Sequence, residues 1–250
     1  MNSVLIISFA VLSYLIGSIN WAVFISKRKK SDIRTLGSGN PGTLNMSRNF
    51  GLKFGILTFL LDVLKGVVPT LVTYFVFKGG FIENSEFNAS DFAILLSGLC
   101  VILGHIFPVY MDFKGGKGIA STIGVLIVCN SVYGLSWAVI VIMSLVAALL
   151  FIYLTEFGAM GSFIAITPPA VCVSIRLFLT YGKTTNSITS VINLLCNLFV
   201  FGICFFTWVA HRKNIERMLA GDEHPTSIKS MVVKAKAKKL EEKMKAENNK

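Results

Sequence analysis

Glycine and basic residues occur together at two places in this chain. Residues 37–42 read GSGNPG and are followed by Arg48, and residues 113–118 read FKGGKG. Glycine lets backbone N–H groups approach an anion closely, and lysine and arginine supply positive charge, so either stretch could bind a phosphate group. A third polar group follows the last apolar run and consists of His211, Arg212, Asn214 and Arg217. These residue types indicate phosphate chemistry.

The composition places these residues in a membrane protein. Hydrophobic residues make up 54% of the 250 positions and charged residues only 15%, with a mean hydropathy of +0.69. The surface of a soluble domain does not allow this balance. A bilayer core of roughly 30 Å needs about 20 apolar residues per helix. We predict an all-α, polytopic membrane helix bundle with about seven transmembrane helices, near residues 3–25, 54–77, 91–111, 118–132 (the shortest), 134–154, 158–180 and 187–210.

Basic residues predict how this bundle is oriented. Seven Lys and Arg residues lie in positions 26–53, opposed only by Asp32, whereas Glu83, Glu86 and Asp91 dominate the next loop. Because Lys and Arg favour the cytoplasmic side, the N-terminus is expected outside. Seven crossings then place the C-terminus in the cytoplasm, in agreement with eleven Lys and Arg against six Asp and Glu in residues 211–250. In this topology all three polar groups face the cytoplasm.

A few charged or polar residues fall inside the apolar runs, where they are costly unless paired or functional. Asp62 and Lys65 stand three apart, share a helical face and can neutralise each other. Either a packing pair or a catalytic pair fits that spacing. His105 is either a packed helix-end histidine or a site residue. Arg176, near the outer end of its run, is expected to extend toward the membrane surface.

The spacing of cysteines and histidines and the distribution of charge do not predict a metal site, a cofactor or nucleic-acid binding. The five cysteines fall in or beside apolar runs without CxxC spacing, and the three histidines are far apart. We therefore expect no metal and no cofactor. The net charge of +11 is explained by cytoplasmic loops and a basic tail, so it does not predict nucleic-acid binding.

The order of the motifs resembles a known enzyme family. Residues 32–48, 104–120 and 211–223 resemble, in that order, three signatures of the bacterial acyl-phosphate:glycerol-3-phosphate acyltransferases, the PlsY family. Residues 62–66 also resemble a family pattern, so the likeness covers roughly residues 1–225. We predict an integral membrane acyltransferase domain over residues 1–225 and a basic cytoplasmic tail over residues 226–250.

The resemblance implies a specific reaction in the bacterial cytoplasmic membrane, with the active site facing the cytoplasm. A fatty acyl group would pass from acyl-phosphate to the 1-hydroxyl of glycerol 3-phosphate, giving lysophosphatidic acid and phosphate, the first step of phospholipid synthesis. The substrates would be acyl-phosphate and glycerol 3-phosphate, among membrane lipids. A functional link to the enzyme that forms acyl-phosphate follows. Because acyl-phosphate is already activated, charge stabilisation and alignment could suffice without a covalent intermediate.

The resemblance also implies roles for individual residues. The proton acceptor is either His211, since histidine titrates near neutral pH, or the phosphate of the donor. Catalytic roles fall on Ser38, Arg48, Lys117, His211 and Asn214. Phosphate binding falls on Gly39, Asn40, Gly42, Thr43, Asn45, Lys114, Gly115, Gly116 and Gly118.

Three positions depart from the family pattern. Leu44 stands where threonine is usual, Glu156 where a basic residue is expected, and Ala210 where arginine is common. These changes keep two alternatives open: a paralogue with another substrate, and a transporter that binds an organophosphate without acyl transfer. A CDP-alcohol phosphotransferase would need clustered metal-binding aspartates, and the aspartates of this chain are dispersed.

Overall fold

The computed structural model describes residues 3–222 together with Thr226, Val233 and Ala237. Six stretches of these residues are long and apolar enough to cross a membrane, and a shorter apolar helix accompanies them. The predicted all-α membrane bundle is confirmed. Most of the predicted basic tail lies outside the described residues. The helices are α1 (Ser3–Gly17), α2 (Trp21–Arg28), η1 (Ile33–Thr35), α3 (Thr43–Phe50), α4 (Leu52–Phe77), α5 (Ala89–Ile106), η2 (Val109–Met111), α6 (Ile119–Ser131), α7 (Leu135–Thr155), α8 (Gly158–Tyr181), α9 (Ser187–Ala210) and α10 (Arg212–Leu219).

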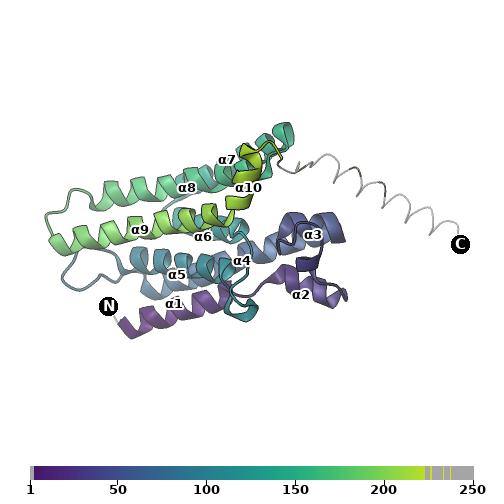
Figure 1. Ribbon diagram of the computed structural model, residues 1–250. Helices are drawn as coiled ribbons and strands as arrows, with labels where there is room; N and C mark the ends of the chain where they lie inside the picture. Colours follow the sequence, from purple (N-terminus) through teal and green to yellow (C-terminus); the bar gives the residue numbers. More distant parts are fainter. Residues whose placement is uncertain (1–2, 223–225, 227–232, 234–236, 238–250) are drawn as a thin grey trace, which may run out of the picture.

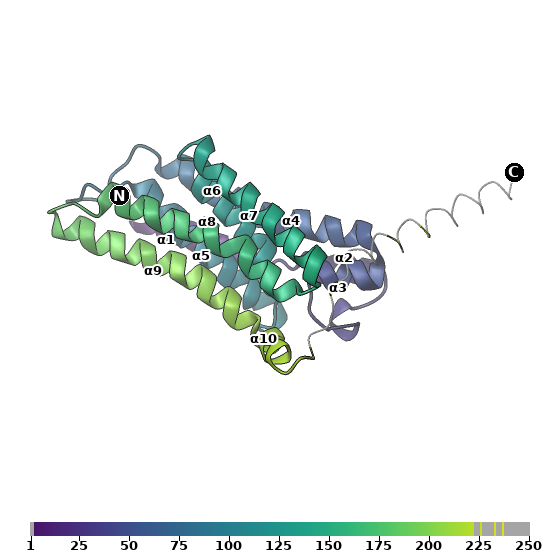
Figure 2. The same ribbon diagram turned by 90° about the horizontal axis from the view of Figure 1, so that it is seen from above.

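The long helices lie side by side, and the short helices α2, α3 and α10 gather at one end of the bundle (Figure 1). We call this end the site end. The opposite end, where residues 78–88 and 182–186 connect helices, is called the far end. Both views show α1 beginning near the far end (Figure 2). The core packs α5, α6, α8 and α9 together through buried side chains such as Ile94, Leu126, Ile166 and Ile203. Which end faces the cytoplasm stays a prediction.

The first apolar run forms two helices instead of one. The chain leaves helical geometry after Gly17, and α2 begins with Asn20 as its N-cap, whose side chain accepts a hydrogen bond from the N–H of Val23. Irregular backbone at membrane depth needs partners for its carbonyl groups. Lys65 provides one, since its Nζ donates to the carbonyl of Ile19 at 2.7 Å and lies 3.1 Å from Asp62 Oδ1. These contacts favour the packing interpretation of the Asp62–Lys65 pair.

The fourth predicted run forms a helix, α6, that is shorter than the six candidate membrane spans. The 13 residues of α6 span about 20 Å, less than a bilayer core of roughly 30 Å. Residues 114–118 precede α6 in non-helical conformation, and both Gly116 and Gly118 are buried. The second glycine loop therefore lies within the bundle at the site end.

Arg176 does not extend to the surface, contrary to the sequence-based expectation. Its Nη2 donates to Asp91 Oδ1 at 3.0 Å, and its guanidinium carbon lies 3.5 Å from the ring centroid of Tyr133. The hydroxyl of Tyr181 donates to the other oxygen of Asp91 at 2.7 Å. An arginine left unpaired in the apolar interior would be costly, and the carboxylate on α5 removes that cost by joining α5 to α8.

Candidate active site

The first glycine loop, residues 37–42, is held in place by Asn45 on α3. The Nδ2 of Asn45 donates to the carbonyls of Ile33 and Leu36, at 3.2 and 2.9 Å. Its Oδ1 accepts the N–H of Ser38 at 3.2 Å. Gly37 has φ +56°, and a Cβ there would lie 2.5 Å from Asn45 Oδ1. Asn45 is 1% exposed, so in this structure it shapes the loop, and a direct phosphate contact stays a prediction.

This loop leads into the N-terminus of α3. Gly42 is the N-cap and has no side chain to occupy the first N–H groups of the helix, which begins at Thr43. Such a terminus attracts anions through its N–H groups and the helix dipole. The loop is anchored on its other side by Asn20, whose Nδ2 donates to the carbonyl of Pro41 at 3.3 Å. Ser38 and Arg48 are exposed, and Gly39 and Asn40 are half-buried.

The second glycine loop, residues 114–118, is held by backbone bonds to the end of α5. The N–H of Gly115 donates to the carbonyl of Ile106 at 3.0 Å, and that of Gly116 donates to the carbonyl of His105 at 3.1 Å. A Cβ on Gly116 would overlap Nε2 of His105. His105 is 4% exposed and its Nδ1 lies 3.4 Å from Ser121 Oγ. It is a packed residue beneath the loop.

The loop ends at the N-terminus of α6. Gly118 is the N-cap with φ +84°, a left-handed conformation that favours glycine. Like Gly42, it leaves the first N–H groups of a helix without a side-chain cap. Lys117 directly precedes it and is half-buried, whereas Lys114 is exposed.

His211 and Asn214 bring the third polar group to this loop. Lys117 Nζ donates to Asn214 Oδ1, which joins the second loop to α10. His211 Nδ1 lies 2.8 Å from the carbonyl of Thr207. A carbonyl only accepts, so Nδ1 carries the hydrogen, and in the neutral ring Nε2 is the basic nitrogen. The edge of Phe163 also packs against the ring, with centroids 5.4 Å apart.

The short helix η2, which precedes the second glycine loop, packs against the elements that flank the first loop. Met111 packs against a small apolar cluster made by Ala22, Val23, Ile33 and Met46, which come from α2, η1 and α3. The elements that carry the three polar groups of the sequence therefore lie at the same end of the bundle, the site end (Figure 1).

Asp32 and Arg34 fix the turn that precedes the first loop. Arg34 donates to both carboxylate oxygens of Asp32, from Nε at 3.0 and 3.1 Å and from Nη2 at 2.7 Å. These hydrogen bonds lower the pKa of Asp32 to about 2 and raise that of Arg34. The carboxylate therefore stays ionised and caps η1.

Comparison with known proteins now defines the family. A sequence model described as glycerol-3-phosphate acyltransferase matches residues 7–221. The chain belongs to the glycerol-3-phosphate acyltransferase family. The glycerol-3-phosphate acyltransferase of Mycoplasmopsis pulmonis is 36% identical over 87% of this chain and 91% of its own. That of Aquifex aeolicus is 32% identical over 86% of this chain and 95% of its own.

Solved structures agree with this acyltransferase assignment. A crystal structure of PlsY (YgiH), an integral membrane glycerol 3-phosphate acyltransferase in its glycerol 3-phosphate form, superposes with a TM-score of 0.67 at 30% identity. It covers 88% of this chain and 94% of its own. The lysophosphatidic acid form of the same protein superposes with a TM-score of 0.66 at 29% identity. This acyltransferase is therefore a multi-pass membrane enzyme.

The positions that depart from the family pattern have definite places in this acyltransferase. Leu44 lies in the first turn of α3 and is 40% exposed, and Thr43 beside it is the first residue of that helix. Ala210 is the last residue of α9, directly before His211. Glu156 is the C-cap of α7 with φ +62°.

Sequence reasoning missed three residues that support the acyltransferase site. Asn20 anchors the first loop, Thr207 orients His211 through its carbonyl, and Thr226 accepts a hydrogen bond from Arg48 at 3.3 Å. Thr207 could have been found from its spacing, four residues before His211 on one helix. The other two contacts join residues 21 and 178 positions apart, and no local pattern marks them.

Proposed function

We propose that the site end transfers an acyl group from an acyl-phosphate to the 1-hydroxyl of glycerol 3-phosphate. The hydroxyl oxygen bonds to the acyl carbon, the bond from that carbon to the phosphate oxygen breaks, and lysophosphatidic acid and inorganic phosphate leave. The observation that carries the proposal is the meeting of Lys117, Asn214 and His211 beside a helix N-terminus that only glycine caps.

Two such N-termini suit a reaction in which both substrates carry phosphate. The N-termini of α3 and α6 each follow a glycine loop, and each offers N–H groups to an anion. We assign one phosphate to Lys114, Lys117 and the second loop. We assign the other to Ser38, Arg48 and the first loop. The hydrogen bond from Lys117 to the neutral amide of Asn214 orients the ammonium without cancelling its charge.

His211 is the general base in this proposal. The carbonyl of Thr207 holds the hydrogen on Nδ1, so Nε2 is the nitrogen able to take the proton of the attacking hydroxyl. A ring fixed by Thr207 and Phe163 loses little freedom on binding substrate. Asn214 and Lys117 then stabilise the negative charge that develops on the acyl oxygen or the leaving phosphate.

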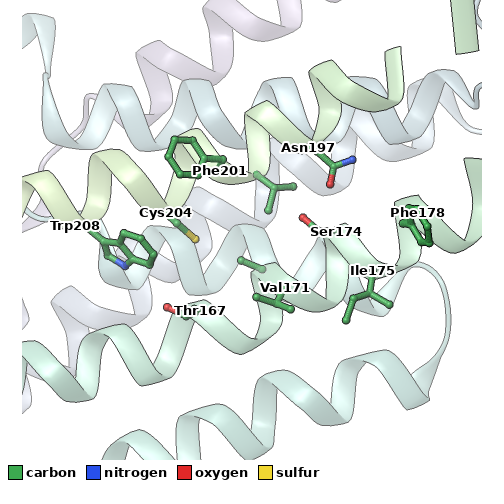
Figure 3. Close-up of a pocket in the computed structure, with 11 residues that line it drawn as sticks. Thr167, Val171, Ser174, Ile175, Phe178, Asn197, Phe201, Cys204 and Trp208 are labelled. Atoms are coloured by element: carbon green, nitrogen blue, oxygen red, sulfur yellow. The ribbon is translucent and has the colours of Figure 1, made fainter. Parts of the chain in front are cut away.

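A groove between α8 and α9 gives the acyl chain a path from this site into the membrane. Its volume is about 500 Å³, and Val171, Ile175, Phe201 and Trp208 line it (Figure 3). From Thr167 to Phe178 the groove follows α8 for about 16 Å. Trp208 contacts Phe163, with ring centroids 6.1 Å apart, and Phe163 contacts His211. The groove therefore begins one aromatic ring away from the proposed base.

The site end faces the cytoplasm in this proposal, because the basic loops at residues 26–53 and the basic segment after α9 lie there. Glycerol 3-phosphate is water-soluble and enters from that side, whereas the acyl chain stays in lipid. The donor needs an enzyme that makes acyl-phosphate, which sets a functional link between the two proteins.

The test is an assay of the purified full-length chain in lipid nanodiscs with palmitoyl-phosphate and glycerol 3-phosphate in excess chelator. We expect phosphate release and lysophosphatidic acid formation that require both substrates. Lys117→Ala should lower the rate by about 100-fold or more, in the range seen when one donor to developing charge is removed. The matched control is Lys29→Ala, since Lys29 lies over the ring of Phe54 at 4.6 Å.

Other results would point to a different function. Binding of glycerol 3-phosphate without phosphate release would favour the transporter. A requirement for a divalent metal and a cytidine-diphosphate lipid would favour a phosphotransferase. Equal rates for Lys117→Ala and Lys29→Ala would remove Lys117 from the site.

A further inference from the structure

We propose that Thr226 is a positioning residue for Arg48, holding the guanidinium at the edge of the first glycine loop. The inference rests on the proposed function, in which Arg48 binds a substrate phosphate. Thr226 follows α10 along the chain and lies beyond the three sequence motifs.

Thr226 is fixed from two sides. Its N–H donates to the carbonyl of Glu156 at 2.8 Å, in the turn between α7 and α8. Its hydroxyl oxygen accepts a hydrogen bond from Arg48 Nη2 at 3.3 Å. Its exposed fraction is only 3%. One threonine therefore connects α3 to the α7–α8 turn.

The α7–α8 turn is shaped to receive this residue. A Cβ on Gly158 would lie 2.6 Å from Thr226 Oγ1 and 3.2 Å from Thr226 Cβ, so any other residue at 158 would displace the threonine. Glu156 has left-handed geometry, with φ +62°, and contributes its backbone carbonyl to the contact. Glu156, which departs from the family pattern, therefore contacts Thr226 through its main chain.

The contact matters because Arg48 is a long, exposed side chain on α3. Arginine loses much rotamer freedom when it binds, and a guanidinium held in advance binds phosphate at a lower entropic cost. The hydroxyl accepts from Arg48 Nη2 and so fixes one corner of a planar group whose shape suits a phosphate. The N–H of Thr226 is bound to the α7–α8 turn, which belongs to the helix bundle. The hydroxyl contact therefore fixes the position of Arg48 relative to the bundle.

The test begins with Thr226→Val, which keeps the shape and removes the acceptor. We expect kcat/KM for one of the two phosphate substrates to fall about tenfold, mainly through a higher KM. Thr226→Ser, which retains the hydroxyl, should recover most of that loss. The matched control is Thr184→Val at the far end, where the hydroxyl donates to Glu86 Oε2 at 2.9 Å. Its kinetics should equal those of the wild type.

A double-mutant cycle separates positioning from general support of the fold. Arg48→Lys keeps the charge but lacks the guanidinium fork, so Thr226→Val should lower its activity by no more than about twofold. If the activity losses of Thr226→Val and Arg48→Lys multiply in the double variant, the two residues act independently and the inference is overturned. Gly158→Ala should also raise the KM, because the added methyl group would displace Thr226. A wild-type KM in that variant would contradict the inference.

The outcomes distinguish this inference from the proposed function. Wild-type kinetics in Arg48→Lys would remove Arg48 from the phosphate site and defeat the inference, while the acyl transfer itself is tested separately by the Lys117→Ala assay. An impaired Arg48→Lys beside a wild-type-like Thr226→Val would defeat the inference alone. A lower unfolding temperature in Thr226→Val with unchanged KM values would show a purely structural role and overturn it as well.

Discussion

The two glycine loops look alike in sequence but are supported differently. The first, residues 37–42, depends on the side chain of Asn45, which bonds to Ile33, Leu36 and Ser38. The second, residues 114–118, depends on backbone bonds to the end of α5 and lies directly over His105. The first loop is half-open to solvent, whereas the second has buried glycines. Two loops with similar glycine-rich sequences are therefore expected to lose their conformation through different kinds of mutation.

The difference predicts how each loop tolerates change. A loop held by one side chain can be released by removing that side chain. A loop held by main-chain bonds has no such residue to remove, so it is disturbed only by adding atoms where the packing has no space. The predictions below test this contrast, from the largest expected effect to the smallest.

Gly116→Ala should have the largest effect, a loss of activity of about 100-fold or more, because a displacement of about 1 Å at a catalytic group has that cost. The added methyl group overlaps the ring of His105, so the loop and Lys117 must shift. Phosphate release measures the loss. Gly80→Ala, at a far-end position whose Cβ would lie 3.6 Å from its nearest neighbour atom, is the control for an added methyl. Normal activity in Gly116→Ala would show that the second loop is not held against His105.

Asn45→Ala should lower activity by about tenfold and the free energy of unfolding by about 2–3 kcal/mol, because a buried amide with three loop bonds is lost. Thermal unfolding and phosphate release together measure it. Asn193→Ala on α9, where the amide oxygen accepts a local bond from Asn197 at 3.2 Å, is the matched control. An effect no larger than the control would mean that the first loop is held by other contacts.

Gly37→Ala should cost about 1–2 kcal/mol, since alanine at φ +56° adopts a left-handed conformation. Its methyl group would also press on Asn45 Oδ1. Added to Asn45→Ala, the same change should cost less than it does alone, because the obstructed atom is gone. Unfolding measurements on both single variants and the double variant give the comparison, and simple additivity would contradict the contact.

Asp32→Asn should have the smallest effect, below about 1 kcal/mol, because the ion pair with Arg34 is partly exposed to solvent. The pKa of Asp32 is lowered from 3.8 to about 2, so its contribution is present above about pH 4 and is lost as pH falls toward 2. The difference in unfolding temperature between the wild type and this variant should shrink over that range. A difference independent of pH would exclude the ion pair as its cause.

The sequence was sufficient for the membrane bundle, the order of the motifs and the family. Seven apolar runs and three ordered polar groups are local patterns, and the length of an apolar run shows whether it can cross a bilayer. The family resemblance is confirmed by relatives that cover most of the chain. The roles of individual site residues remain predictions, although the structure brings the groups that carry them together.

Other features depended on contacts that no local pattern reveals. The hydropathy of residues 3–25 predicts one helix, yet the helix is interrupted at residues 18–20. There Lys65, 46 residues away, donates a hydrogen bond to the carbonyl of Ile19. Arg176 reads as a residue that reaches the membrane surface, yet Asp91, 85 residues away, pairs with it in the interior. In both cases the partner lies on another helix.

The sequence by itself determined where this chain crosses the membrane and which side chains gather at one end, because apolar length and polar clustering are properties of short segments. Only the tertiary structure decided that Asn45 holds the first loop, that Lys117 meets Asn214, and that Thr226 reaches Arg48. The physical reason is that hydrogen-bond partners are chosen by distance and direction in space. Those quantities exist only after the helices have packed.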